Sequence, residues 1–186
     1  MTISHLRVGP LLFITAFLAV PMVAAECPAD YLDKRALVKL AHASSLRELC
    51  SAFLAIPIPD AVSKLVYAVR QAELQPGPEA DDALIAVIPR YELEYEFVYS
   101  VTTSELDRDE ALNSICGGGW LDRVADAIVR RGHGFAAFLR LSFFNNADLA
   151  EQLPELNSFL REKQPAAFAK ALASLPREVR DSVAFE

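Results

Sequence analysis

Apolar residues recur at helical spacing along most of this chain, and prolines or capping residues interrupt the pattern. The segment 30–43 follows this spacing. Ser45 and Glu48 match a capping box, which predicts a second helix from Leu46. Pro57 cannot continue that helix. The chain is therefore expected to be built mainly from short helices.

The same signals predict further helices. Asp60 can cap a helix over 61–74, and the segments 104–116 and 120–132 also show helical spacing. The glycines 117–119 between the last two segments are expected to act as a hinge, because glycine tolerates backbone conformations that other residues avoid.

Three prolines, Pro154, Pro165 and Pro176, are spaced eleven residues apart in the C-terminal third. Proline is favoured at the first position of a helix. Each is therefore expected to open one short helix that covers the core.

The region 83–101 fits two structures. Tyr91 to Val101 alternate apolar and acidic or polar residues, which favours a strand with one solvated face. Leu84, Ile88 and Tyr95 also fit helical spacing, although Pro89 interrupts it. The predicted fold is mainly α with a small β-hairpin or sheet around 83–101, and an all-α fold is the alternative.

The first 25 residues have the order of a secretory signal. Arg7 precedes the apolar run 11–20, and small residues stand at Val23 and Ala25. The run is half the roughly 20 residues that span a membrane. We therefore expect cleavage after Ala25, export to a bacterial periplasm or secretion, and no stable membrane anchor afterwards.

The remaining residues 26–186 have a length typical of one domain. They contain 17 Lys and Arg against 25 Asp and Glu. Nucleic-acid binding requires neutralisation of phosphates by basic side chains, so this balance argues against it. An acidic chain is instead compatible with a basic partner.

An oxidising compartment makes the three cysteines disulfide candidates. Cys50 is expected near a helical turn and Cys27 at the far end of the preceding helix. We therefore predict a Cys50–Cys116 bridge, with Cys27 free or as the alternative partner.

The sequence identifies no catalytic or metal-binding residues. In "CGGGW", Gly119 stands where a papain-like nucleophile would precede the aromatic residue. The glycines lack the Lys-Ser/Thr pair of a phosphate loop. His42 and His133 have no second ligand at zinc spacing. No cofactor is expected, although an enzyme with dispersed catalytic residues stays open as an alternative.

Two groups are candidate binding residues. Glu92, Glu94 and Glu96 would share one strand face and could meet a basic protein surface. The aromatic residues Phe135, Phe138 and Phe143 follow a helical stripe that could line an apolar pocket.

These observations predict an exported protein that acts by protein–protein interaction, such as an inhibitor, an immunity-like factor or an envelope accessory factor. A carrier of a small hydrophobic ligand, which the aromatic stripe would hold, is the alternative function.

Overall fold

The computed structural model of this chain describes residues 34–104, 109–116 and 119–186. Regular structure within these ranges is helical, and no strand occurs in them, so the mainly α prediction is confirmed. The elements are α1 Lys34–Ala41, α2 Leu46–Leu54, α3 Ala61–Leu74, α4 Pro78–Ala86, α5 Glu92–Ser104, α6 Glu110–Cys116, α7 Gly119–Arg131, α8 Phe135–Leu139, the 3-10 helix η2 Arg140–Phe143, α9 Ala147–Lys163, α10 Pro165–Ser174 and α11 Arg177–Ser182.

Several predictions concern residues outside these ranges. The signal sequence 1–25, Cys27 and the glycines 117 and 118 lie outside the described residues, so the structure does not bear on them. Gly119, the third glycine of the expected hinge, is the first residue of α7.

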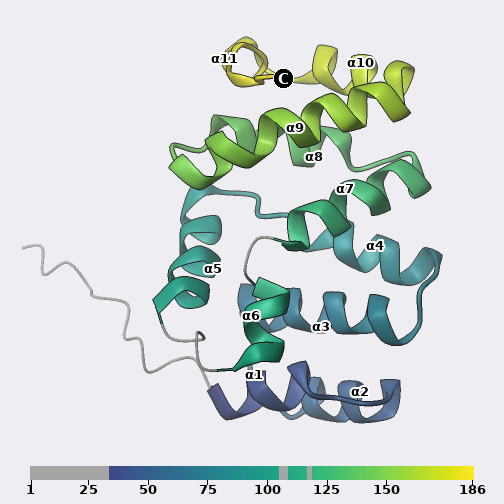
Figure 1. The fold of residues 1–186 in the computed structure, drawn as a ribbon, viewed down its shortest axis with the longest axis vertical. Helices are drawn as coiled ribbons and strands as arrows, with labels where there is room; N and C mark the ends of the chain where they lie inside the picture. Colours follow the sequence, from purple (N-terminus) through teal and green to yellow (C-terminus); the bar gives the residue numbers. More distant parts are fainter. Residues whose placement is uncertain (1–33, 105–108, 117–118) are drawn as a thin grey trace, which may run out of the picture. The chain divides into compact units, whose positions relative to one another are not determined.

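The helices pack against one another largely in chain order (Figure 1). Helices α1 to α3 contact one another, α3 packs on α4, α4 on α7, α7 on α9, and α9 on α10. Helices α5 and α6 both contact α3, and α6 also contacts α1 and α7. The 3-10 helix η2 touches α8, α9 and α11.

Side-chain caps begin the helices where the sequence predicted them. Ser45 Oγ accepts a hydrogen bond from Glu48 N at 3.3 Å, and Asp60 Oδ1 accepts one from Ser63 N at 2.7 Å. A third cap is Asn146, whose Oδ1 accepts from the first N–H groups of α9. Each cap satisfies donors that have no partner inside the helix.

The preferred β element around 83–101 is wrong, and the all-α alternative is correct. Residues 83–86 end α4, and α5 begins at Glu92. Tyr95 and Val98, three residues apart, are both buried, as expected for one face of a helix. The helical spacing in this region therefore predicted the structure correctly, whereas the alternation of apolar and acidic residues did not.

The prolines open helices in two of the three predicted cases. Pro165 is the first residue of α10, and Pro176 directly precedes α11. Pro154 instead lies inside α9, which corrects the expectation. Asn146 caps α9 eight residues earlier, and the buried Leu149, Leu153 and Leu156 pack its inner face. This burial keeps α9 helical on both sides of Pro154.

A buried asparagine joins three elements in the C-terminal half. Asn157 on α9 is 0% exposed. Its Nδ2 donates to Ser142 Oγ on η2 at 3.3 Å and to the carbonyl of Ala184 at 3.1 Å. Because buried polar groups are costly without partners, this pair of bonds fixes η2 and the last residues against α9.

We predict that Asn157→Ala lowers the free energy of unfolding by about 1–3 kcal/mol, since both bonds are lost. Amide exchange should also accelerate at residues 183–186. Denaturant unfolding and hydrogen exchange measure these two effects. The control Glu162→Ala changes an exposed residue of the same helix and should leave both unchanged. Equal amide exchange at residues 183–186 in Asn157→Ala and Glu162→Ala would contradict the role of Asn157 in fixing the last residues against α9.

A glycine lets the chain turn tightly between α7 and α8. Gly134 has φ +94°, and a Cβ placed there would lie 2.7 Å from Ile85 Cγ2 and 3.1 Å from Ile128 Cγ1. Gly132 also has a positive φ, +71°, but nothing lies within 4 Å of its Cβ position. Gly134 is therefore required for both its conformation and its close approach to α4 and α7.

We predict that Gly134→Ala destabilises the protein by about 2–4 kcal/mol, from left-handed strain plus overpacking. Gly132→Ala should cost only the strain, about 1–2 kcal/mol. Gly119→Ala should change stability little, because its φ is not positive and its surroundings are open. Denaturant unfolding of the three variants tests this order, and equal losses at Gly132 and Gly134 would exclude a packing role for Gly134.

Candidate functional site

The three glutamates predicted to bind a partner lie on the first two turns of α5. Glu94 Oε2 accepts a hydrogen bond from Arg90 N at 2.8 Å, so it caps the start of the helix. Glu92 Oε1 accepts one from Asn145 N at 3.0 Å. Glu96 is exposed. Two of the three carboxylates thus have structural partners, and Glu96 faces solvent.

The bond from Asn145 to Glu92 holds the start of α9 beside the start of α5. The rings of Tyr95 and Phe144 reinforce this contact, with centroids 6.4 Å apart. Two segments about fifty residues apart in sequence therefore form one surface.

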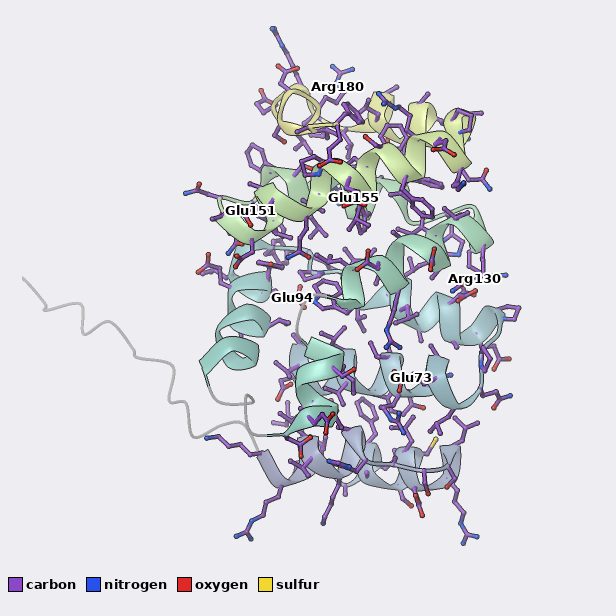
Figure 2. All side chains as sticks on the ribbon, viewed as in Figure 1. Glu73, Glu94, Arg130, Glu151, Glu155 and Arg180 are labelled. Carbon is purple, nitrogen blue, oxygen red and sulfur yellow. The ribbon has the colours of Figure 1, made fainter. Side chains whose placement is uncertain are left out.

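The beginning of α9 adds further carboxylates to this surface. Asp148, Glu151 and Glu155 occur at i, i+3 and i+7, which places them on one side of the helix. Glu151 and Glu155 are exposed, and Figure 2 shows both on the same side of α9, with Glu94 at the end of α5 nearer to α9. These three residues are not among the binding residues predicted from the sequence, although their helical spacing is visible in it.

Large apolar side chains are exposed at the start of α5 and on η2, which precedes α9. Tyr91 is 72% exposed, Leu93 is 83% exposed, and Phe143, one residue before Phe144, is 55% exposed. We call this region the α5–α9 surface, defined by Tyr91, Glu92, Leu93, Glu94, Glu96, Phe143, Asp148, Glu151 and Glu155.

The aromatic residues predicted to line a pocket do not come together. Phe135 and Phe138 on α8 are buried in the core, whereas Phe143 is exposed at the end of η2. A cavity of about 110 Å³ does lie nearby, between η2, α9 and the chain after α11. It is lined by Phe144 and by none of the three predicted residues. Its lining is Leu141, Ser142, Phe144, Leu149, Ala150, Leu153, Pro154, Ser182 and Ala184.

Cys50 is an exposed free thiol on α2, so the predicted bridge from Cys50 to Cys116 is not formed in this structure. The sulfur lies 3.5 Å from Tyr67 Oη. Burial and the neighbouring thiol raise the pKa of Tyr67, and the hydrogen bond with Cys50 is the larger cause. The side chain of Cys116 lies outside the described part of the structure.

The two histidines are each paired with a carboxylate. His42 Nε2 lies 3.0 Å from Asp109 Oδ2, and His133 Nε2 lies 2.9 Å from Asp82 Oδ1. Both rings are about half exposed. In the described ranges, no group of three or more His, Cys, Asp or Glu residues is placed to hold a metal ion.

Paired charges join α4 to α7. Arg130 donates to Asp81 through Nε at 3.0 Å and Nη2 at 2.7 Å, and Arg131 donates to Asp82 at 2.8 and 3.0 Å. A hollow of about 560 Å³ beside the α3–α4 turn is lined partly by Asp81 and both arginines. Because each arginine has a bidentate partner, the guanidinium charges in this hollow are already neutralised.

The hydrogen bonds from Arg131 are the largest cause of a lowered pKa at Asp82; desolvation opposes them, and the hydrogen bond with His133 adds a smaller lowering. A carboxyl with a depressed folded-state pKa stabilises the fold above its unfolded pKa of about 4. That stabilisation is lost as the pH falls through the folded value.

We predict that Asp82→Asn is less stable than the unmodified chain at neutral pH, and that the two converge as the pH falls below about 4. Urea unfolding across this pH range measures the difference. Asp122→Asn, at an exposed carboxylate in the first turn of α7, is the control. A difference for Asp82→Asn that stays constant down to about pH 2 would refute the linkage.

No family model, curated protein or solved structure matches this chain. Among the described helices, none has the length and apolar character needed to cross a membrane. What the chain binds is therefore inferred from the chemistry of its own surface.

Proposed function

We propose that this chain is a protein-interaction protein whose α5–α9 surface binds a partner protein with a basic surface. The observation that carries the proposal is the exposure of Tyr91, Leu93 and Phe143 among carboxylates on two helices held together by the Glu92–Asn145 bond. Solvated helix faces commonly carry charge, but three large apolar side chains exposed on adjoining elements are typical of an interface.

The charge of the surface defines the partner. Glu96, Glu151 and Glu155 are exposed, and the chain as a whole carries a formal net charge of −7. The basic residues of α9, Arg161 and Lys163, lie in its last turn, and Arg90 and Arg140 precede the two helices, so acidic groups predominate at the starts of α5 and α9. Such a surface accelerates encounter with a basic partner and disfavours acidic ones.

The apolar side chains supply the affinity. Tyrosine and large apolar residues at the centre of an interface, surrounded by charged groups, are where binding energy is usually concentrated. Tyr91 and Leu93 stand on either side of Glu92 in the chain, so apolar and acidic contacts alternate at the start of α5. A partner is expected to match this with basic residues around an apolar patch.

A second exposed apolar pair is less suited to this role. Leu54 and Ile58, at and beyond the end of α2, are 83% and 82% exposed. The carboxylate that follows them, Asp60, already accepts the Ser63 N–H as the cap of α3. This turn therefore lacks the unpaired acidic neighbours that specify a basic partner.

Export is part of the proposal, because the sequence of residues 1–25 has the order of a secretory signal. The partner would then be an exported or envelope protein. The classes named from the sequence, an inhibitor, an immunity-like factor or an envelope accessory factor, all act by such contacts.

Site-specific photo-crosslinking in the cells that naturally produce the chain tests the proposal. A crosslinker at Leu93 should give a discrete protein adduct, because that side chain is exposed at the start of α5. A crosslinker at Ala169, exposed on α10, is the control and should not give the same adduct.

We predict that reversing Glu96, Glu151 and Glu155 to lysine removes the Leu93 adduct and leaves the fold intact, since these residues are exposed. Glu92 and Glu94 are kept, because they hold backbone N–H groups. The control reverses Asp122, Glu162 and Glu178, which changes the net charge equally at exposed positions elsewhere. An adduct that survives the first variant, or is lost in both, would show that the α5–α9 carboxylates do not direct binding.

A further inference from the structure

The cavity next to the α5–α9 surface has a mainly apolar lining. Leu149, Leu153 and Pro154 of α9 form one wall, and Leu141 and Phe144 form another. Ala150 and Ala184 also line it and are exposed, so a group from solvent can reach it.

The walls are held in place before any ligand binds. Asn157 Nδ2 bonds both Ser142 Oγ and the carbonyl of Ala184, two residues that line the cavity from different elements. Asn157 is itself fully buried. A site that is already formed loses little conformational entropy on binding, which favours affinity.

The volume limits what can enter. The cavity is about 110 Å³. Small-molecule sites usually measure roughly 300–1,000 Å³, and a cavity of about 150 Å³ accepts benzene. The size therefore suits one aliphatic side chain better than a whole metabolite or lipid tail.

Pro154 changes the hydrogen bonding of α9 at the cavity wall. It has no N–H, so the carbonyl of Ala150 lacks its α-helical donor four residues later. Both residues line the cavity. Because the proline ring crowds that carbonyl, what this wall offers to an incoming group is its apolar surface.

The acidic face of α9 borders the cavity. Glu151 directly follows Ala150, and Glu155 directly follows Pro154, so each carboxylate is one step, about 100°, around the helix from a lining residue. Both carboxylates are exposed (Figure 2). A basic side chain next to the inserted group therefore meets negative charge.

We infer that the partner inserts a single leucine-sized side chain, flanked by lysine or arginine, into the cavity between η2, α9 and Ala184. This inference rests on the proposed function and adds to it the feature that the partner must present. The inserted side chain supplies affinity, and the flanking basic residues engage Glu151 and Glu155.

The test uses the full chain and two fluorescent peptides. Both carry two lysines on each side of a central residue, which is leucine in one and alanine in the other. Fluorescence anisotropy should show about tenfold tighter binding of the leucine peptide than of the alanine peptide. This factor is the gain in affinity expected from burying most of an isobutyl group. Ala150→Phe, which fills the cavity from its exposed edge, should remove this difference, and Ala184→Leu should reduce it.

Ala173→Phe is the control, because Ala173 is exposed on α10 and does not line the cavity. It should retain the tenfold preference. Circular dichroism of each variant checks that the helices are kept.

The outcomes separate the two proposals. Charge reversal at Glu151 and Glu155 could weaken the binding of both peptides while the leucine and alanine peptides bind equally and Ala150→Phe has no effect. In that case the inserted side chain is wrong, and the proposal of an acidic binding surface is supported. If charge reversal changes nothing, or neither peptide binds at about 1 mM, the preference for basic partners is wrong as well. A leucine preference that Ala150→Phe abolishes and Ala173→Phe keeps supports the inference.

Discussion

The contact between α4 and α7 is the constraint on which the remaining helices depend. Its apolar part is formed by small and branched residues such as Leu84, Val124 and Ile128, all nearly inaccessible to solvent. Two bidentate arginine–aspartate pairs close its outer edge. Gly134 then approaches Ile85 and Ile128 so closely that a Cβ at this position would require their side chains to shift. Burial fixes the spacing of the two helices, and the directional ion pairs fix their register.

That register determines where the α5–α9 surface forms. The chain leaves α7 through Gly132 and Gly134, continues into α8 and η2, and reaches α9 at Asn146. Helix α5 is reached separately, from the end of α4, and the two paths meet where Asn145 donates to Glu92. The surface is thus assembled from both sides of the α4–α7 contact. The Asn145–Glu92 hydrogen bond and the Tyr95–Phe144 ring contact help to hold it together.

The sequence was informative wherever local chemistry decides local structure. Ser45 and Asp60 cap helices as expected, because a side-chain oxygen three residues before an N–H satisfies it in almost any context. The alternation at Tyr91 to Val101 misled, because period-two and helical spacing overlap there and only packing against α3 decides between them. Pro154 misled for a similar reason, since burial of α9 outweighs a missing hydrogen bond. The glutamates of α5 were visible in the sequence, but their neighbours on α9 depend on a contact across about fifty residues.

The carboxylates of the α5–α9 surface are of two kinds: some accept hydrogen bonds from backbone N–H groups, and others are exposed. Glu92 accepts the Asn145 N–H and so holds the start of α9 beside α5, and Glu94 accepts the Arg90 N–H just before α5. Glu96, Glu151 and Glu155 are exposed on the same two helices. Glu92, Glu94 and Asp148 lie in the first turns of α5 and α9, where the helix dipole stabilises negative charge, whereas Glu96, Glu151 and Glu155 lie beyond those turns. The exposed apolar residues have no such stabilisation in the free chain. A surface that combines exposed carboxylates with exposed apolar side chains is therefore best explained as one that a basic, partly apolar partner covers.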